Sequence, residues 1–184
     1  MKRLAKVVLA LIFVAGLAGM GSALSARRSG GPAKGDYAVG GGRFGPGCFT
    51  GGVCFAKPRD FSVDAHADRK DKHVSGRLFY GNNEGALSVA VDVTCLRLSG
   101  NRAVVGGIDQ FGNGATMFLI DNGPPGPGAR DLASPLDVDT LDAPQWPAGF
   151  PYVCPSLDGN AAGYQEVHSG DVQVQDDVHA NGGR

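Results

Sequence analysis

The sequence lacks an excess of charge of either sign. It carries 17 Lys and Arg residues against 18 Asp and Glu residues, which leaves a formal net charge of -1. Proteins that bind nucleic acid without sequence specificity carry a basic patch or a strongly basic domain. The even balance therefore argues against that class of function, and we expect no nucleic-acid partner.

The sequence also lacks the compact motifs of common hydrolases. It contains neither the H-E-x-x-H zinc motif nor the G-x-S-x-G turn that presents a nucleophilic serine. Glycines cluster at residues 40–42 and 106–107, but no helical pattern follows either cluster, so they do not predict phosphate-binding loops. We expect backbone bends or a close approach of strands there instead. No catalytic residue is predicted.

Long helical patterns are scarce as well. With 30 glycines and 11 prolines among 184 residues, the chain holds about twice the usual share of these two residues, which excludes a helical bundle. Short apolar or alternating runs lie between turn signals, which is the pattern of an all-β domain. We predict a single disulfide-stapled domain over residues 48–176, with an antiparallel β-sandwich and a small β-barrel as the alternatives.

Several runs predict individual strands. Apolar residues alternate with polar ones over residues 61–65 and again over 86–98, as in strands with one buried face. In the second run the apolar parity switches near Cys95, which predicts a β-bulge or strong bend. Residues 103–108 and 115–120 are almost continuously apolar and too short for stable helices, so we predict buried strands. Val172 and Val174 predict a last short strand.

The N-terminus has the pattern of a secretory signal peptide. Basic residues precede an apolar run from Val7 to about Met20, and small residues follow at 21–26. We predict cleavage at about residues 23–26, with a retained membrane anchor as the alternative. Removal of residues 1–26 leaves a mildly acidic, secreted or periplasmic protein with no membrane contact. Residues 27–47 read as a Gly-rich flexible leader, and residues 177–184 as a frayed tail.

All four cysteines, Cys48, Cys54, Cys95 and Cys154, lie after the predicted signal peptide. An even number of cysteines in an exported chain favours disulfides over metal ligands or catalytic thiols. Three pairings are possible. The spacing C-F-T-G-G-V-C favours a local Cys48–Cys54 bridge and leaves Cys95 and Cys154 for a long-range one. A four-cysteine zinc site is the alternative, but its usual C-x2-C and C-x4-C spacings are absent.

A Pro/Gly-rich stretch over residues 121–151 interrupts the strand pattern. A loop of about thirty residues in a compact domain is usually functional, disordered or tied down. Cys154 would tie down its far end. Trp146, Phe150 and Tyr152 lie just before that cysteine, and we expect them to cover a sheet edge or barrel end, or to contact a ligand.

Metal ligands can be drawn from two groups of residues. His66, His73 and His168 could form a zinc site on paper, although exposed histidines in turns and on polar faces are the favoured interpretation. Asp121 and Asn122, with Asp131, Asp137 and Asp139 downstream, could offer oxygen ligands to calcium, but Asp-Asn-Gly is also an ordinary turn sequence. We therefore expect no resident cofactor, with calcium or zinc as the alternatives.

Residues 93–107 have the sequence VTCLRLSGNRAVVGG. Together with IDNG at 120–123, a late Y-V-C and a closing GDVQV strand, this segment resembles a group of small secreted bacterial proteins of unknown function. This resemblance implies export, a β-rich domain and a Cys95–Cys154 bridge, and it implies no activity.

Two functional hypotheses remain. The favoured one is a non-enzymatic extracellular binding or structural module that contacts an extracellular ligand or a cell-surface component. The alternative is a secreted metal-assisted hydrolase that uses His66, His73 or His168.

Overall fold

The structure is a computed structural model that describes residues 35–68, 73–82, 88–124, 130–139, 152–160 and 162–177. The predicted signal peptide, the tail from residue 178, Trp146 and Phe150 lie outside these ranges. Within them all twelve named elements are strands, which confirms the all-β prediction. In the described ranges no helix is long and apolar enough to cross a membrane.

The strands follow one another in the chain in this order: β1 (Asp36–Phe44), β2 (Gly47–Cys48), β3 (Cys54–Phe55), β4 (Arg59–Asp68), β5 (His73–Gly81), β6 (Ser88–Ser99), β7 (Arg102–Asp109), β8 (Gly114–Ile120), β9 (Leu132–Ala133), β10 (Asp137–Asp139), β11 (Gln165–Glu166) and β12 (Ser169–Gln175). All but β2 and β3 belong to one sheet of order β11-β9-β8-β7-β6-β5-β4-β1-β12, in which β10 also pairs with β8. All pairings are antiparallel.

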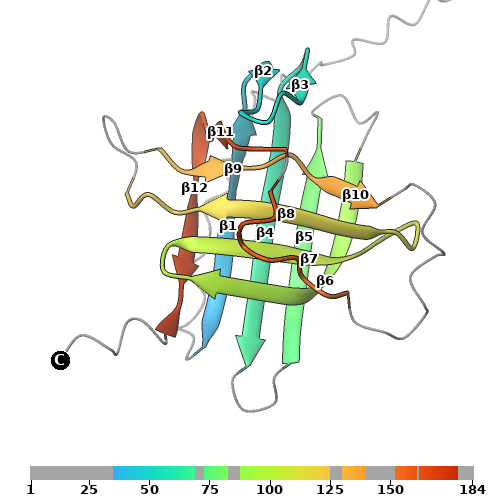
Figure 1. Cartoon of the computed structure of the whole chain (residues 1–184), viewed down its shortest axis with the longest axis vertical. Helices are drawn as coiled ribbons and strands as arrows, with labels where there is room; N and C mark the ends of the chain where they lie inside the picture. The colour runs from blue at the N-terminus through green and yellow to red at the C-terminus, as the bar shows by residue number, and fades with distance from the viewer. Residues whose placement is uncertain are drawn as a thin grey trace, which may run out of the picture.

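The sheet curls into a half-barrel. In Figure 1, β12, β1, β4 and β5 run from top to bottom at the back, and β7 and β8 cross in front of them. The change of direction occurs along β6, whose pairing with β7 shifts register between Val93 and Cys95. An extra residue at a bulge bends a strand and increases its twist. The bend predicted from the parity switch is therefore confirmed, and it decides for one curled sheet.

Side-chain carboxylates join the two ends of the sheet. Strands β11 and β12 lie at opposite ends of the strand order but are neighbours in the chain. The backbone N–H of Val172 donates to Asp131 Oδ2 at 2.7 Å, and that of Val174 donates to Asp121 Oδ2 at 3.0 Å. These carboxylates thus accept hydrogen bonds from an edge that has no strand on that side. Burial raises the pKa of Asp131, and the nearby carboxylate of Asp121 adds to this effect.

Two apolar clusters lie on opposite faces of β7 and β8. Alternate residues such as Val105 and Met117 join the main core inside the half-barrel, whereas Val104 and Phe118 pack with Tyr152 on the other face. The segment 152–160, which we call the outer strap, covers that outer face. Both faces are buried, which is why these two strands read as continuous apolar runs.

The predicted flexible leader is wrong for its second half. Residues 36–44 form β1, which pairs with β4 on one side and with β12 on the other. The glycines allow close contact between these strands. A Cβ added at Gly40 would lie 2.1 Å from the Asp171 carbonyl oxygen, and one at Gly42 would lie 2.2 Å from Val167 Cγ1. Glycine is thus required for packing here, as the alternative of close strand approach predicted.

Candidate functional site

Both predicted disulfides are present. Cys95 on β6 bonds to Cys154 on the outer strap, and Cys48 on β2 bonds to Cys54 on β3. The described residues contain no free cysteine. The first bridge fastens the outer strap to the sheet, and the second closes a small hairpin, residues 47–55, which we call the lid.

The lid lies at one end of the half-barrel, at the top of Figure 1. Phe49 at its tip is 2% exposed, and its ring lies 5.2 Å from that of Phe44 and 5.8 Å from that of Phe55. Thr50 N–H donates to the Tyr164 carbonyl at 3.0 Å. The lid is therefore held on one side by aromatic packing on the core and on the other by hydrogen bonds to the segment before β11.

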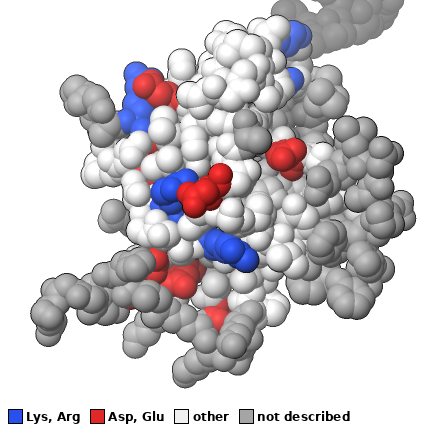
Figure 2. Space-filling view, viewed as in Figure 1, with Lys and Arg blue, Asp and Glu red and all other residues white. Residues whose placement is uncertain are grey.

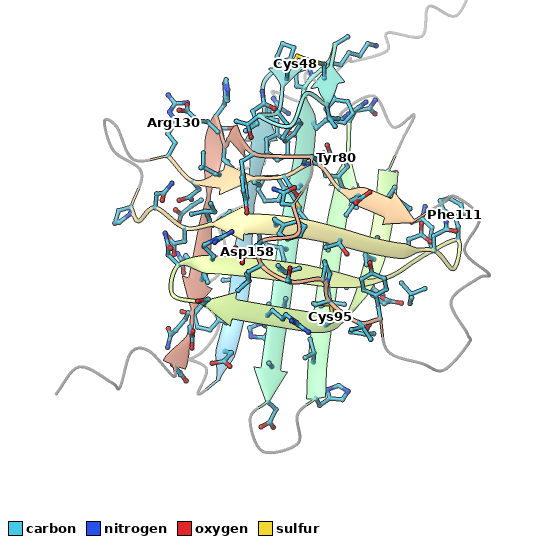
Figure 3. All side chains as sticks on the ribbon, viewed as in Figure 1. Cys48, Tyr80, Cys95, Phe111, Arg130 and Asp158 are labelled. Atoms are coloured by element: carbon cyan, nitrogen blue, oxygen red, sulfur yellow. A yellow bond between two sulfur atoms is a disulfide. The ribbon has the colours of Figure 1, made fainter. Side chains whose placement is uncertain are left out.

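Three polar side chains belong to residues at this end of the sheet, and we call them the Arg59 cluster. Arg59 begins β4, Tyr80 is near the end of β5, and Asn82 follows that strand. Strand alternation puts Arg59 on the face of Phe61, and Tyr80 pairs with Phe61. Arg59 and Asn82 come one step beyond the Asp60–Gly81 pair. Figure 3 shows Tyr80 in the upper part of the large sheet, below Cys48 of the lid.

Each member of the Arg59 cluster has a buried polar atom that lacks a hydrogen-bond partner in the described part of the chain: Arg59 Nη1, Tyr80 Oη and Asn82 Oδ1. Tyr80 is 8% exposed. Buried polar atoms without partners are rare in native proteins, and each one calls for an explanation. The described residues contain two further such atoms, Arg102 Nε and Gln165 Oε1, and the three of the cluster come from β4, from β5 and from the residue after β5, at one end of the sheet.

The Arg59 cluster combines one positive charge with two neutral polar groups, the Tyr80 hydroxyl and the Asn82 amide oxygen. The guanidinium carbon of Arg59 lies 4.8 Å from the Phe55 ring centroid, which favours the cation. Burial raises the pKa of Tyr80 to about 12, although Arg59 opposes this shift. Tyr80 therefore remains a protonated hydroxyl at neutral pH and can donate a hydrogen bond. Arg43 and Asp60 form an ion pair at 2.7 Å, and alternation places both on the opposite face.

A second arginine, Arg102, binds the outer strap. Arg102 Nη2 donates to the Leu157 carbonyl at 2.8 Å, and its Nη1 lies 3.4 Å from Asp158. Arg102 thus fastens the outer strap. Figure 2 shows basic and acidic side chains in small neighbouring groups on a mostly uncharged face, so the described part of this face carries no broad basic patch.

Of the three aromatic residues predicted to contact a ligand, Tyr152 is the one within the described residues. It is 9% exposed, and its ring packs over Gly106 and Gly114, where an added Cβ would lie 3.0 and 2.4 Å from ring carbons. Thr116 Oγ1 donates to its hydroxyl at 2.9 Å. Tyr152 therefore packs the outer strap on the sheet face, and its predicted contact with a ligand stays a prediction.

The structure does not bring the three histidines together. His66 and His73 lie on the β4–β5 hairpin, and Nε2 of His66 lies 2.6 Å from Asp64 Oδ1. Tyr37 pairs with His66, whereas the backbone carbonyl of Arg43 accepts a hydrogen bond from the backbone N–H of His168. Six residues of β1 separate these two positions, about 20 Å along an extended strand. In the described ranges, no group of three or more His, Cys, Asp or Glu residues could hold a metal ion.

The predicted calcium ligands bond to the backbone of their own turn and of its neighbours. Asp121 Oδ1 accepts the N–H of Gly123 at 2.7 Å, and Asn122 Nδ2 donates to the Arg130 carbonyl at 2.7 Å. Asp131 Oδ1 accepts the N–H of Asn122 at 2.9 Å. This is the turn chemistry of Asp and Asn, so the alternative to a metal site accounts for these residues.

Sequence reasoning missed the Arg59 cluster. Arg59 follows a Lys-Pro pair and Asn82 lies in a GNN turn, so both residues read as solvent-exposed. The available signal was the alternation of β4 extended back by two residues from Phe61, which puts Arg59 on the buried face.

Comparisons with known proteins add no assignment. No protein-family model matches the chain. Neither the curated proteins nor the solved structures give a significant match. The functional argument therefore depends on the residues and their geometry.

Proposed function

We propose that the protein is an exported, non-enzymatic binding module that holds a small ligand at the Arg59 cluster, under the lid. The observation that carries the proposal is the set of three buried polar atoms, Arg59 Nη1, Tyr80 Oη and Asn82 Oδ1, with no partner among the described residues.

Burying these atoms without hydrogen-bond partners lowers the stability of the protein. A buried donor or acceptor without a partner costs about 1–3 kcal/mol, and more for a charged group. A ligand that supplies the missing partners removes this cost, so its polar groups gain more there than at an exposed site. An arrangement that is unfavourable without a ligand is typical of a binding site.

Export is supported by the cysteines together with the N-terminal pattern. Neither the lid nor the outer strap belongs to the large sheet. One disulfide closes the lid, and the other fastens the outer strap to β6. Disulfides form and persist in oxidising compartments. The basic, apolar and small-residue order of residues 1–26 is that of a signal peptide, which supports a mature protein in the periplasm or outside the cell.

Native mass spectrometry of the protein recovered from its export compartment tests this proposal. We expect a mature N-terminus near residues 23–26, a mass about four hydrogens below that of the reduced chain, and an additional non-covalent mass from a small organic molecule. A protein that carries no such mass, and that binds nothing from the same compartment after refolding, would contradict the binding function. A bound transition metal would instead favour the hydrolase alternative.

A further inference from the structure

We propose that the ligand of the Arg59 cluster is a small carboxylate with an aromatic or apolar body and a hydrogen-bond donor next to its carboxyl group. The inference rests on the proposed binding function and specifies the ligand of the same site.

The two donors of the cluster select a carboxylate. Arg59 Nη1 and Tyr80 Oη both lie buried without an acceptor in the described part of the chain, and they come from the paired strands β4 and β5. A carboxylate offers two oxygens, one for each donor, and its charge matches that of a single guanidinium. A phosphate dianion would need more donors and a second positive charge. With water excluded, the attraction between opposite charges also becomes stronger.

Asn82, the acceptor of the cluster, determines which group of the ligand lies beside the carboxylate. Asn82 Oδ1 is buried without a donor in the described ranges, and it lies one step beyond the last residue pair of β4 and β5, on the level of Arg59. A ligand anchored through its carboxylate to Arg59 would place its adjacent carbon near this oxygen. A hydroxyl or N–H on that carbon would donate to Asn82, so an α-hydroxy or α-acylamino acid fits best.

The aromatic residues at this end of the half-barrel suit an apolar body. Phe44 stacks on Phe61 with ring centroids 5.2 Å apart, and the rings of Phe44 and Tyr80 lie 6.4 Å apart. Phe49 and Phe55 of the lid continue this group. These rings are 0–8% exposed for Phe44, Phe49, Phe61 and Tyr80 and pack on one another, and a ring of the ligand beside them would make the offset or edge contacts that aromatic pairs prefer.

Three probes of similar size separate these requirements: mandelate, phenylacetate and phenylacetamide. Mandelate carries a carboxylate and an α-hydroxyl, phenylacetate lacks the hydroxyl, and phenylacetamide lacks the charge. They are titrated by calorimetry into the mature, oxidised, refolded protein. We expect mandelate to bind more tightly than phenylacetate by several-fold, and phenylacetamide to bind at least tenfold more weakly than phenylacetate.

Variants assign the contacts. Arg59→Gln should weaken phenylacetate at least tenfold, and Asn82→Leu should abolish the preference for mandelate. Arg77→Gln is the matched control, because Arg77 on β5 is exposed and faces Asp92 on the other side of the sheet. Phe111→Ala controls for adsorption of the probes to exposed apolar surface, since Phe111 is 67% exposed. Both controls should bind as the wild type does. Tyr80→Phe, which keeps the aromatic packing, should weaken phenylacetate several-fold and serves as the second variant if Arg59→Gln does not fold.

The possible failures are distinguishable. If phenylacetamide binds as tightly as phenylacetate, or Arg59→Gln and Tyr80→Phe leave the affinity unchanged, the carboxylate inference is wrong while a binding function remains. If none of the three probes binds but the recovered protein carries a small molecule without a carboxyl group, the inference is again overturned and the proposed function is retained. If the recovered protein also carries no small molecule, both are wrong.

Discussion

Replacing Cys95 and Cys154 together by alanine should destabilise the domain more than any other change that leaves the sheet intact. The bridge joins β6 at its bend to the outer strap, and both sulfur-bearing residues are buried, at 8% and 6% exposure. Alanine is preferred to serine because a serine hydroxyl would be buried on the outer apolar cluster.

The magnitude follows from the length of chain that the bridge closes. The two cysteines are 59 residues apart in sequence, for which chain-entropy theory gives a loss of about 4 kcal/mol in the free energy of unfolding. Cys48 and Cys54 are 6 residues apart, which gives about 2 kcal/mol for the corresponding double variant. The long bridge should therefore contribute about twice as much stability as the short one.

Urea unfolding of the wild type and of both double variants, followed by circular dichroism, measures these differences. The Cys48→Ala, Cys54→Ala variant is the matched control, because it also removes one bridge and two sulfur atoms. Equal losses for the two variants, or no loss for the Cys95 and Cys154 pair, would refute the reasoning that the outer strap depends on its bridge.

Three further predictions concern single residues, and urea unfolding measures each of them. Tyr80→Phe removes a hydroxyl without a partner in the described chain, so it should raise the free energy of unfolding of the ligand-free protein by up to about 1 kcal/mol, and a loss of stability would contradict the argument. Asp131→Asn leaves one acceptor oxygen where the carboxylate has two, which should destabilise by about 1–3 kcal/mol. Burial raises the pKa of Asp131 in the folded protein above its ordinary value of 3.8. Folding therefore takes up a proton, and this carboxyl stabilises the fold more at acid pH than at neutral pH. The stability lost in the Asp131→Asn variant should thus become smaller as the pH rises from about 4 to 7. Gly107→Ala would place a Cβ 2.0 Å from the Asp92 carbonyl oxygen and should cost about 3 kcal/mol.

The strands and the short disulfide could be predicted because their causes are local. The alternation of residues 61–65 reports a single buried face, and the register shift at Val93 and Cys95 reproduces the parity switch seen in the sequence. The pairing of Cys48 with Cys54 follows from a spacing that suits a closed hairpin. Each of these depends on residues that are neighbours in the chain.

The strand over residues 36–44 could not be predicted, because its glycines are required by contacts with residues that are distant in sequence. Gly40 lies against Asp171 and Gly41 against Phe61, so the strand exists through pairing with β4 and β12. Its composition alone is that of a flexible linker.

The candidate site was missed for a related reason. Arg59 and Asn82 have polar side chains next to turn residues, where exposure is the ordinary expectation. Arg59 lies against the Phe55 ring of the lid, and this arrangement is a tertiary feature. Conversely, Tyr152 looked like a contact residue, but the small residues of β7 and β8 that receive it show that it packs on the sheet.

The most direct test of the central claim is a crystal structure of the protein recovered from its export compartment. We expect electron density for an organic molecule within hydrogen-bond distance of Arg59 Nη1, Tyr80 Oη and Asn82 Oδ1. Density showing these three atoms satisfied by ordered water or by the protein's own side chains would contradict this claim.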